Sequence, residues 1–260
     1  MSRFASVMSA LVVACVLPSV SLARDAAALV PFASAEGQAR LARTPAKADF
    51  APLANQFEAQ ATIAFCGPTT AAIVLNALRP VGASRPRDDS RLRPEDSRYL
   101  PPGFDLTVPR YTQESVMAVG HKSRAQVFGA PGLVDGKVVH DGGYQLRQLD
   151  ELLRAHGLVT RLVIVDAQRS TAEIRDDLVG NLRRAGDYVI VNYQRAAVGQ
   201  AGGGHISPLA AYDADSDSVL VLDVNPSLYH WLWMPLATLI DGMRTRDVGE
   251  NRGYILVRSE

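Results

Sequence analysis

The stretch that decides the fold is residues 60–78, QATIAFCGPTTAAIVLNAL. Cys66 stands between an irregular segment and a run whose apolar residues recur at helical spacing. Pro68 suits a first helical turn, and Thr69 and Thr70 can cap it. We therefore expect a helix that begins at Cys66 and packs its apolar stripe into a core.

A thiol at the start of a helix has a distinctive environment. Unpaired backbone N–H groups and the positive end of the helix dipole favour the thiolate, which is the nucleophilic form of cysteine. The position of Cys66 is therefore suited to nucleophilic catalysis. The alternative is a buried cysteine that packs as a small hydrophobic residue.

The composition is that of a globular protein. The chain has 260 residues, of which 47% are hydrophobic, and Lys plus Arg balance Asp plus Glu at 27 each. One large domain or two small lobes can bury a proper core at this length. Without a basic field or an RNA-binding signature, nucleic acid is not an expected partner.

The N-terminus is typical of an export signal. A minimal positive region precedes an uncharged apolar run, and Ser21-Leu22-Ala23 offers small residues at the cleavage-determining positions. We expect residues 1–23 to be a signal peptide, residues 24–55 an N-terminal arm and residues 56–260 the catalytic domain. The exported protein would be periplasmic in a bacterium and free of the membrane after signal removal.

Cys15 leaves an alternative open, because Val12-Val13-Ala14-Cys15 fits a lipoprotein cleavage box. We favour plain secretion over lipidation at Cys15, and an uncleaved membrane anchor is a third option. Either way Cys66 is then the one cysteine in the body of the exported chain. A lone thiol is a hazard in an oxidising compartment, which favours a catalytic role.

The order of the remaining elements predicts an α+β fold. Helical patterns are expected at 144–156 and from a capping box at 170–173 to 185, and at 236–243. Strands are expected at 159–165, 188–193, 205–212, 218–224 and 253–257. The segment 79–110 is rich in Pro, Arg, Asp and Ser and is expected to be a solvated excursion. Helices come first and mostly antiparallel strands follow.

The second half of a site is expected on a hairpin. His205 follows a run of glycines that ends at Gly204, where the backbone can approach a ligand, and Asp223 ends the next strand. If the hairpin turns through residues 214–216, Asp223 lies diagonally from His205 on the same face. His205 would then exchange a proton with Cys66, and Asp223 would orient His205.

Gln60 completes this hypothesis, because its amide and the Cys66 backbone N–H can donate to the oxyanion of an acyl-transfer intermediate. Each residue also has an ordinary interpretation. A histidine after a glycine loop is commonly a surface residue, a strand-end aspartate commonly caps a turn, and a glutamine before a helix commonly has no catalytic role.

At these residues the sequence resembles the phytochelatin synthase family, the glutathione γ-glutamylcysteinyltransferases. The matching text is Gln60 with AFCGPTTAAIVLNAL, then VNYQR at 191–195, GGHISPLAAYD at 203–213 and LVLDV at 220–224. The likeness runs from about residue 60 to residue 258, which corresponds to the short bacterial members without the C-terminal domain of the plant enzymes.

The resemblance implies a papain-like cysteine peptidase fold, with a helical lobe that carries the Cys and an antiparallel β lobe that carries the His and Asp. It also implies that Cys66 attacks the Cys–Gly bond of glutathione, releases glycine and forms a γ-glutamylcysteinyl thioester. Arg195 falls where the family uses an arginine for the substrate, and Asp247 and Arg252 lie near a family Asp and Arg, although with altered spacing. An ordinary exposed strand-end arginine is the alternative for Arg195.

Two departures from the plant-type sequences change the expected outcome. The basic residues that follow the triad aspartate there are replaced here by Asn225-Pro226-Ser227-Leu228, and Phe65 stands where those sequences often have Tyr. If these positions receive the second glutathione, water should intercept the thioester. We therefore expect mainly hydrolysis to γ-glutamylcysteine and glycine, with weak transpeptidation to phytochelatins.

The sequence predicts no metal site and no bound cofactor, because the histidines other than His205 are scattered without paired ligand spacing. Metal ions would enter as thiolate complexes of the substrate or product. The expected partners are glutathione and γ-glutamylcysteine peptides, and a homodimer is compatible with this hypothesis. The alternatives are a papain-like peptidase acting on another small peptide, and an exported thiol-peptide-binding domain without turnover.

Overall fold

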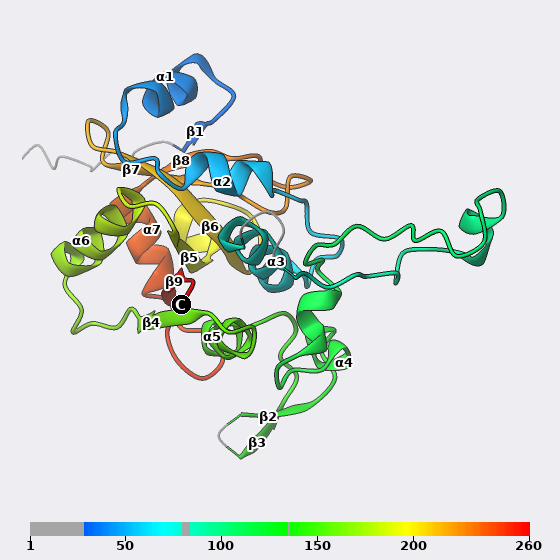
Figure 1. Cartoon of the computed structure of the whole chain (residues 1–260). Helices are drawn as coiled ribbons and strands as arrows, with labels where there is room; N and C mark the ends of the chain where they lie inside the picture. The colour runs from blue at the N-terminus through cyan, green and yellow to red at the C-terminus, as the bar shows by residue number, and fades with distance from the viewer. Residues whose placement is uncertain (1–28, 80–83, 135) are drawn as a thin grey trace, which may run out of the picture.

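The computed structural model describes residues 29–79, 84–134 and 136–260 (Figure 1). The predicted signal peptide at residues 1–23, the alternative lipidation site at Cys15 and the start of the predicted arm lie outside these residues. Within the described part of the chain, no helix is long and apolar enough to cross a membrane.

An antiparallel sheet forms the centre of the molecule. In the described residues it has seven strands in the order β1-β8-β7-β6-β5-β9-β4. The bounds are β1 Val30–Pro31, β4 Val159–Ile164, β5 Asp187–Gln194, β6 Gly204–Asp213, β7 Ser218–Val221, β8 Leu232–Pro235 and β9 Gly253–Arg258. The predicted strands are therefore present, and the fold is α+β with an antiparallel sheet.

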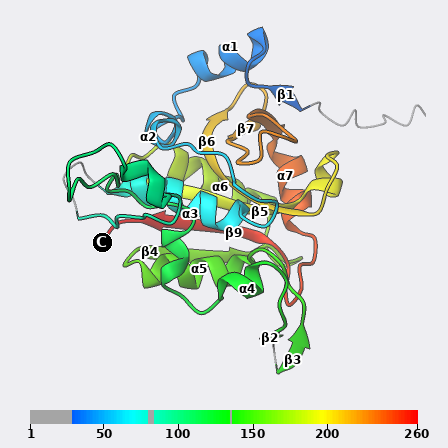
Figure 2. The ribbon, with the colours of Figure 1, turned by 90° about the vertical axis from the view of Figure 1, so that its right-hand side faces the viewer.

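Helices cover both faces of this sheet (Figures 1 and 2). α3 (Cys66–Leu78), α5 (Leu146–Ala155) and α2 (Phe50–Asn55) pack on one face, where the core includes Ile190 and Ile255. α6 (Thr171–Leu182) and α7 (Leu236–Met243) pack on the other, against Val189 and Val191. Because β5 alternates buried residues between the two faces, both cores share one central strand.

The predicted helices form for the reasons that the sequence suggests. α5 buries Leu146, Leu149, Leu152 and Leu153 on one face. α6 begins with the predicted capping box: the Ser170 hydroxyl accepts from the Glu173 N–H, and the Glu173 carboxylate accepts from the Ser170 N–H. It ends at Leu182, three residues before the predicted end at residue 185.

The predicted N-terminal arm is partly built into the fold. β1 pairs with β8 at the edge of the sheet, and α1 (Ala35–Arg43) follows it. The indole N–H of fully buried Trp233 donates to the Gly37 carbonyl at 2.9 Å. The described part of the predicted arm is therefore a layer on the sheet, and β8 itself was not predicted from the sequence.

The segment from residue 84 to residue 110 is the predicted solvated excursion. It projects from the body of the molecule in Figure 1 and carries the short 3-10 helix η1 (Pro94–Ser97). Beyond it come the 3-10 helix η2 (Ser115–Ala118), the one-turn helix α4 (Arg124–Val127) and a hairpin of β2 (Gly132–Val134) and β3 (Lys137–Val139).

Candidate active site

Cys66 is the first residue of α3 and is buried, with 8% of its surface exposed. No side chain among the described residues caps this helix, so the predicted capping by Thr69 and Thr70 is wrong. The Thr70 hydroxyl instead donates to the Ile206 carbonyl on β6 at 3.3 Å. The uncapped helix start leaves the Gly67 backbone N–H to donate to the Cys66 sulfur.

His205 lies near the start of β6 and forms a side-chain hydrogen bond with Cys66. Its Nε2 atom is 2.9 Å from Asp223 Oδ1. His205 is 4% exposed and Asp223 is fully buried. A thiol from the start of a helix, an imidazole from a strand and a carboxylate thus form one continuous chain of contacts.

The turn between β6 and β7 differs from the expectation. Asp213 pairs with Ser218, so the connection is the four residues 214–217 rather than the predicted 214–216. Asp217 closes it with a φ of +48°. This one-residue difference alone would put His205 and Asp223 on opposite faces of the sheet.

A β-bulge in β6 removes the offset. The register shifts between Leu209 and Ala211, and Leu209 pairs with Val221. Continued toward the site, this register puts Asp223 opposite Ser207, two residues from His205 and on the same face. The predicted diagonal is therefore reached through two deviations that cancel: a longer turn and a bulge.

The environment of this group favours a thiolate–imidazolium pair. Burial raises the pKa of the Cys66 thiol. The hydrogen bond and charge of His205 and the backbone N–H groups of Ile206 and Gly67 lower it by more, so the net pKa lies below its ordinary value. Burial lowers the pKa of His205, whereas its contacts with Asp223 and Cys66 raise it above its ordinary value. The two opposite net shifts are those of a nucleophile and its proton partner.

Arg195 lies behind the carboxylate. It is 3% exposed, and its Nη2 donates to Asp223 Oδ1 at 2.9 Å while Nη1 lies 2.8 Å from Oδ2. Nη1 also donates to Gln200 Oε1 at 2.8 Å, and the guanidinium lies over the Tyr229 ring. The expected grip of Arg195 on a substrate carboxylate does not fit this placement, because the guanidinium is buried and already paired with Asp223.

Arg195 also affects the charge of Asp223. Burial raises the pKa of Asp223, but His205 and then Arg195 lower it below its ordinary value. The carboxylate therefore stays ionised in a place without solvent. Its Oδ1 further accepts from the Asn225 N–H at 2.9 Å.

The structure adds two residues that sequence reasoning missed. The Ser207 hydroxyl lies 2.9 Å from His205 Nε2, beside the Asp223 contact. Tyr193, the cross-strand partner of His205 on β5, meets the imidazole edge-on with ring centroids 5.7 Å apart. The pairing of VNYQR with GGHIS in the sheet was the signal for Tyr193, but it required the register of β5 against β6.

A cavity of about 290 Å³ opens onto Cys66 and His205, and we call it the Cys66 cavity. Gly204, Asp247 and Arg252 lie in its wall, together with Asn192, which the sequence did not single out. Ile63, Ala64 and the residues 141–144 also line the cavity. The expected substrate residues other than Arg195 are therefore in the wall next to the thiol.

The polar wall of this cavity is ordered by Asp247. Arg252 Nη2 donates to Asp247 Oδ1 at 3.1 Å, and Asn192 Nδ2 donates to Asp247 Oδ2 at 3.1 Å. A Cβ atom on Gly204 would lie 2.7 Å from Arg252 Nη2. Glycine at position 204 therefore lets the guanidinium approach the strand closely.

Gln60 is half-buried and is tied to the loop that follows Asp223, because its backbone N–H donates to the Val224 carbonyl at 2.8 Å. Its side-chain nitrogen donates to the Thr62 carbonyl at 2.8 Å. Gln60 Oε1 is buried and has no hydrogen-bond partner in the described part of the chain. Gln60 is not among the described residues that line the cavity at Cys66, so its predicted role as an oxyanion donor stays a prediction.

No group of three or more His, Cys, Asp or Glu side chains that could hold a metal ion occurs in residues 29–79, 84–134 and 136–260. The thiol and its proton partners can support acyl transfer through a covalent intermediate.

The sequence is similar to those of known proteins. A sequence model of the family described as phytochelatin synthase matches residues 22–92 and 107–254. The chain is 30% identical over 241 residues to glutathione gamma-glutamylcysteinyltransferase 1 of Triticum aestivum and 28% identical over 238 residues to glutathione gamma-glutamylcysteinyltransferase 3 of Lotus japonicus. Each comparison covers 88% of this chain but only 40% and 42% of the respective relative, so the chain spans about two-fifths of their length. The chain belongs to the phytochelatin synthase family.

Proposed function

We propose that this protein cleaves the Cys–Gly peptide bond of glutathione through a γ-glutamylcysteinyl thioester on Cys66. The observation that carries the proposal is the buried thiol at the start of α3, which is hydrogen-bonded to His205, itself 2.9 Å from Asp223. The relatives named above are glutathione γ-glutamylcysteinyltransferases, which supports glutathione as the donor. A helical lobe with the cysteine and a β lobe with the other two residues would make the fold papain-like.

The first half of the reaction forms the thioester. The Cys66 thiolate attacks the carbonyl carbon of the cysteine residue of glutathione. The Cys66 backbone N–H and the Gln60 amide donate to the oxyanion of the tetrahedral intermediate. The His205 imidazolium gives its proton to the glycine nitrogen, the C–N bond breaks, and glycine leaves.

The second half returns the enzyme to its starting state. Neutral His205 takes a proton from water, the resulting hydroxide attacks the thioester carbon, and the C–S bond breaks to free the Cys66 thiolate and γ-glutamylcysteine. Asp223 holds the imidazole in one orientation and stabilises its charged form throughout. Arg195 keeps Asp223 ionised and is a positioning residue.

Asp247 and Arg252 are proposed to bind the γ-glutamyl end of the donor. Asp247 would accept from its α-ammonium group, and Arg252 would donate to its α-carboxylate. Arg252 is the one arginine or lysine among the described residues that line the Cys66 cavity. With a single guanidinium there and no lysine, a second peptide carrying its own carboxylates is poorly held, which supports hydrolysis over chain extension.

We also propose that the protein acts outside the cytoplasm, in the periplasm of a bacterium. This location rests on the sequence of residues 1–23 alone. Hydrolysis of glutathione there would serve its degradation better than the buffering of metal ions.

The test is glycine release from glutathione by the purified protein, followed by mass spectrometry. We expect glycine and γ-glutamylcysteine in equal amounts, and no release by a Cys66→Ala variant. Turnover of unrelated small peptides but not of glutathione would instead support a general cysteine peptidase. Oligomers of γ-glutamylcysteine as the main product, with or without added zinc or cadmium, would contradict hydrolysis as the main reaction.

A further inference from the structure

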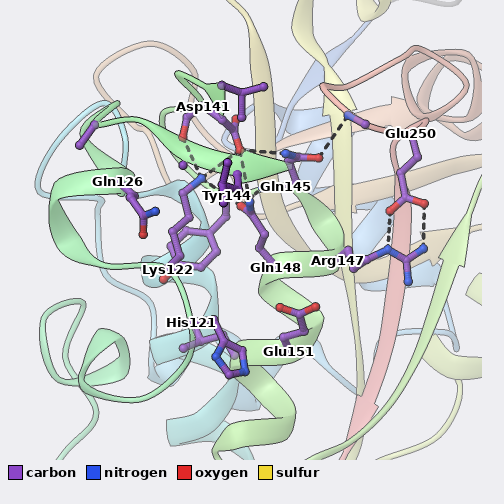
Figure 3. A pocket seen from close by; sticks show the side chains of 16 residues that line it. His121, Lys122, Gln126, Asp141, Tyr144, Gln145, Arg147, Gln148, Glu151 and Glu250 are labelled. Atoms are coloured by element: carbon purple, nitrogen blue, oxygen red, sulfur yellow. Dashed lines mark hydrogen bonds and ion pairs between the residues drawn. The ribbon is translucent and has the colours of Figure 1, made fainter. Parts of the chain in front are cut away.

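A second cavity of about 580 Å³ (Figure 3) shares part of its wall with the Cys66 cavity. It is bounded by α5, the β2–β3 hairpin and the loop at residues 249–250, and the side chains that matter for the argument are Lys122, Asp141, Tyr144, Arg147, Glu151 and Glu250. Asp141 and Tyr144 line both cavities. A molecule that starts at Cys66 can therefore extend past these two side chains.

The shared wall is a partly buried polar network. Lys122 Nζ donates to the Asp141 backbone carbonyl at 2.8 Å, to Asp141 Oδ2 at 3.0 Å and to Gln148 Oε1 at 2.9 Å. Gln145 Nε2 donates to the same Oδ2 at 2.9 Å. All three ammonium hydrogens of Lys122 are used, whereas Asp141 Oδ1 has no partner in the described residues. At the wall between the two cavities, the network therefore offers Asp141 Oδ1 as a free hydrogen-bond acceptor, whereas the Lys122 ammonium group has no free donor.

The charges of the second cavity leave a negative excess. Lys122 is paired with Asp141, and Arg147 is paired with Glu250 through two hydrogen bonds of 2.8 Å, as Figure 3 shows. Glu151 is exposed, its charge acts on Arg147 one helical turn away, and no hydrogen bond or ion pair joins it to another residue that the structure describes. The cavity is therefore suited to a group that carries a positive charge.

The chain itself indicates which end of a substrate reaches this cavity. Asp247, which we propose to bind the γ-glutamyl end, lines the Cys66 cavity, and Gly249 and Glu250, two and three residues later, line the second cavity. The leaving amine, and any amine that replaces it, must lie beside the proton donor His205. His205 is not among the described residues that line the second cavity. The second cavity therefore continues from the donor end of the substrate, not from the leaving-group end.

We propose that the second cavity binds the amino-terminal portion of peptide donors longer than glutathione, and that it favours a portion with a positive charge. The proposal rests on the proposed function. In such a donor the α-nitrogen of the γ-glutamyl residue is part of a peptide bond, and its N–H still donates to Asp247. The added residue then carries its ammonium group toward Asp141 Oδ1 and Glu151.

The experiment compares donors elongated at the α-amino group of glutathione by one lysine or one glutamate. Glycine release gives kcat/KM for each, divided by the value for glutathione in the same protein. Because one partly exposed charge pair is worth a few-fold, we expect the lysine peptide to exceed the glutamate peptide by roughly fivefold. In Glu151→Gln this ratio should fall toward one, whereas Glu95→Gln, a surface change on η1, should keep it.

Glutathione turnover combined with a ratio near one, or with a ratio that Glu151→Gln leaves unchanged, overturns the inference and leaves the proposed function intact. A change in the ratio of transpeptidation to hydrolysis in Glu151→Gln would also overturn the inference, since the cavity would then bind the acceptor peptide. If glutathione is not cleaved at all, the inference is tested by binding. The affinities of the two elongated peptides for the Cys66→Ala variant are then measured by calorimetry. Tighter binding of the lysine peptide that is lost with Glu151→Gln supports the cavity, and equal binding refutes it.

Discussion

Replacing Arg195 by glutamine separates its two proposed roles. In the structure the guanidinium is 3% exposed, contacts both Asp223 oxygens and is not in the wall of the Cys66 cavity. If Arg195 acts through Asp223, the variant loses the charge that keeps the carboxylate ionised. If Arg195 instead binds the substrate, the variant loses affinity for glutathione.

The magnitude follows from the burial of the pair. Removing one partner of a buried ion pair costs roughly 3–5 kcal/mol of folding stability. At roughly 2–4 °C per kcal/mol for a domain of this size, the melting temperature should fall by about 10 °C. Weakening the Asp223 contact to His205, a charge-assisted hydrogen bond worth about 1.5–3 kcal/mol, should lower kcat by about 10- to 100-fold.

The assay is glycine release at several glutathione concentrations, with a thermal melt of the same protein. We expect Arg195→Gln to lower kcat and leave KM nearly unchanged. Arg195→Lys keeps the charge but not the two-point contact, so its kcat should lie between those of Arg195→Gln and the wild type. A raised KM with an unchanged kcat would refute the positioning role and return Arg195 to the substrate.

The rate of glycine release should be bell-shaped in pH, because the net pKa of Cys66 is lowered and that of His205 is raised. Activity appears as pH rises through the lowered Cys66 pKa and is lost as pH rises through the raised His205 pKa, and alkylation of the thiol by iodoacetamide should follow the acid limb. Gly253→Ala should destabilise the protein by about 3 kcal/mol in urea unfolding, since the new Cβ would lie 2.0 Å from the Val163 carbonyl oxygen between β9 and β4. Asp247→Asn should raise KM for glutathione about tenfold with little change in kcat, because an ionic hydrogen bond to the donor becomes a neutral one.

Each of these predictions has a matched control or a contradictory outcome. Gly203→Ala adds a Cβ with nothing within 4 Å and should leave urea unfolding unchanged. Alkylation of Cys66 that follows an ordinary thiol pKa near 9.0 would contradict the thiolate–imidazolium pair. An Asp247→Asn variant that loses kcat at constant KM would remove Asp247 from the donor site.

The sequence was sufficient to predict the helix at Cys66 and the strands that carry His205 and Asp223, because each has a clear local pattern. It was not sufficient to predict how these two residues meet. The turn is one residue longer than expected, and a β-bulge between Leu209 and Ala211 restores the register. Local sequence cannot determine such a pair of offsets, since the bulge is selected by packing on both faces of the sheet.

Arg195 shows a second limit. An arginine at the end of an expected strand has no local feature that separates a buried partner of Asp223 from a substrate-binding residue. Its role depends on the fold of η3 (Arg195–Val198) and on Gln200 and Tyr229, which enclose the guanidinium. The second cavity was likewise beyond the sequence, because segments far apart in the chain form its wall.

The central claim is a covalent thioester on Cys66, and the intact mass of the protein tests it most directly. The enzyme would be mixed with glutathione, quenched in acid within the first turnovers and analysed by mass spectrometry with peptide mapping. The account predicts an added mass of one γ-glutamylcysteinyl group on the peptide that contains Cys66, removed by hydroxylamine. Release of glycine without such an adduct, or with an adduct on another residue, would contradict it.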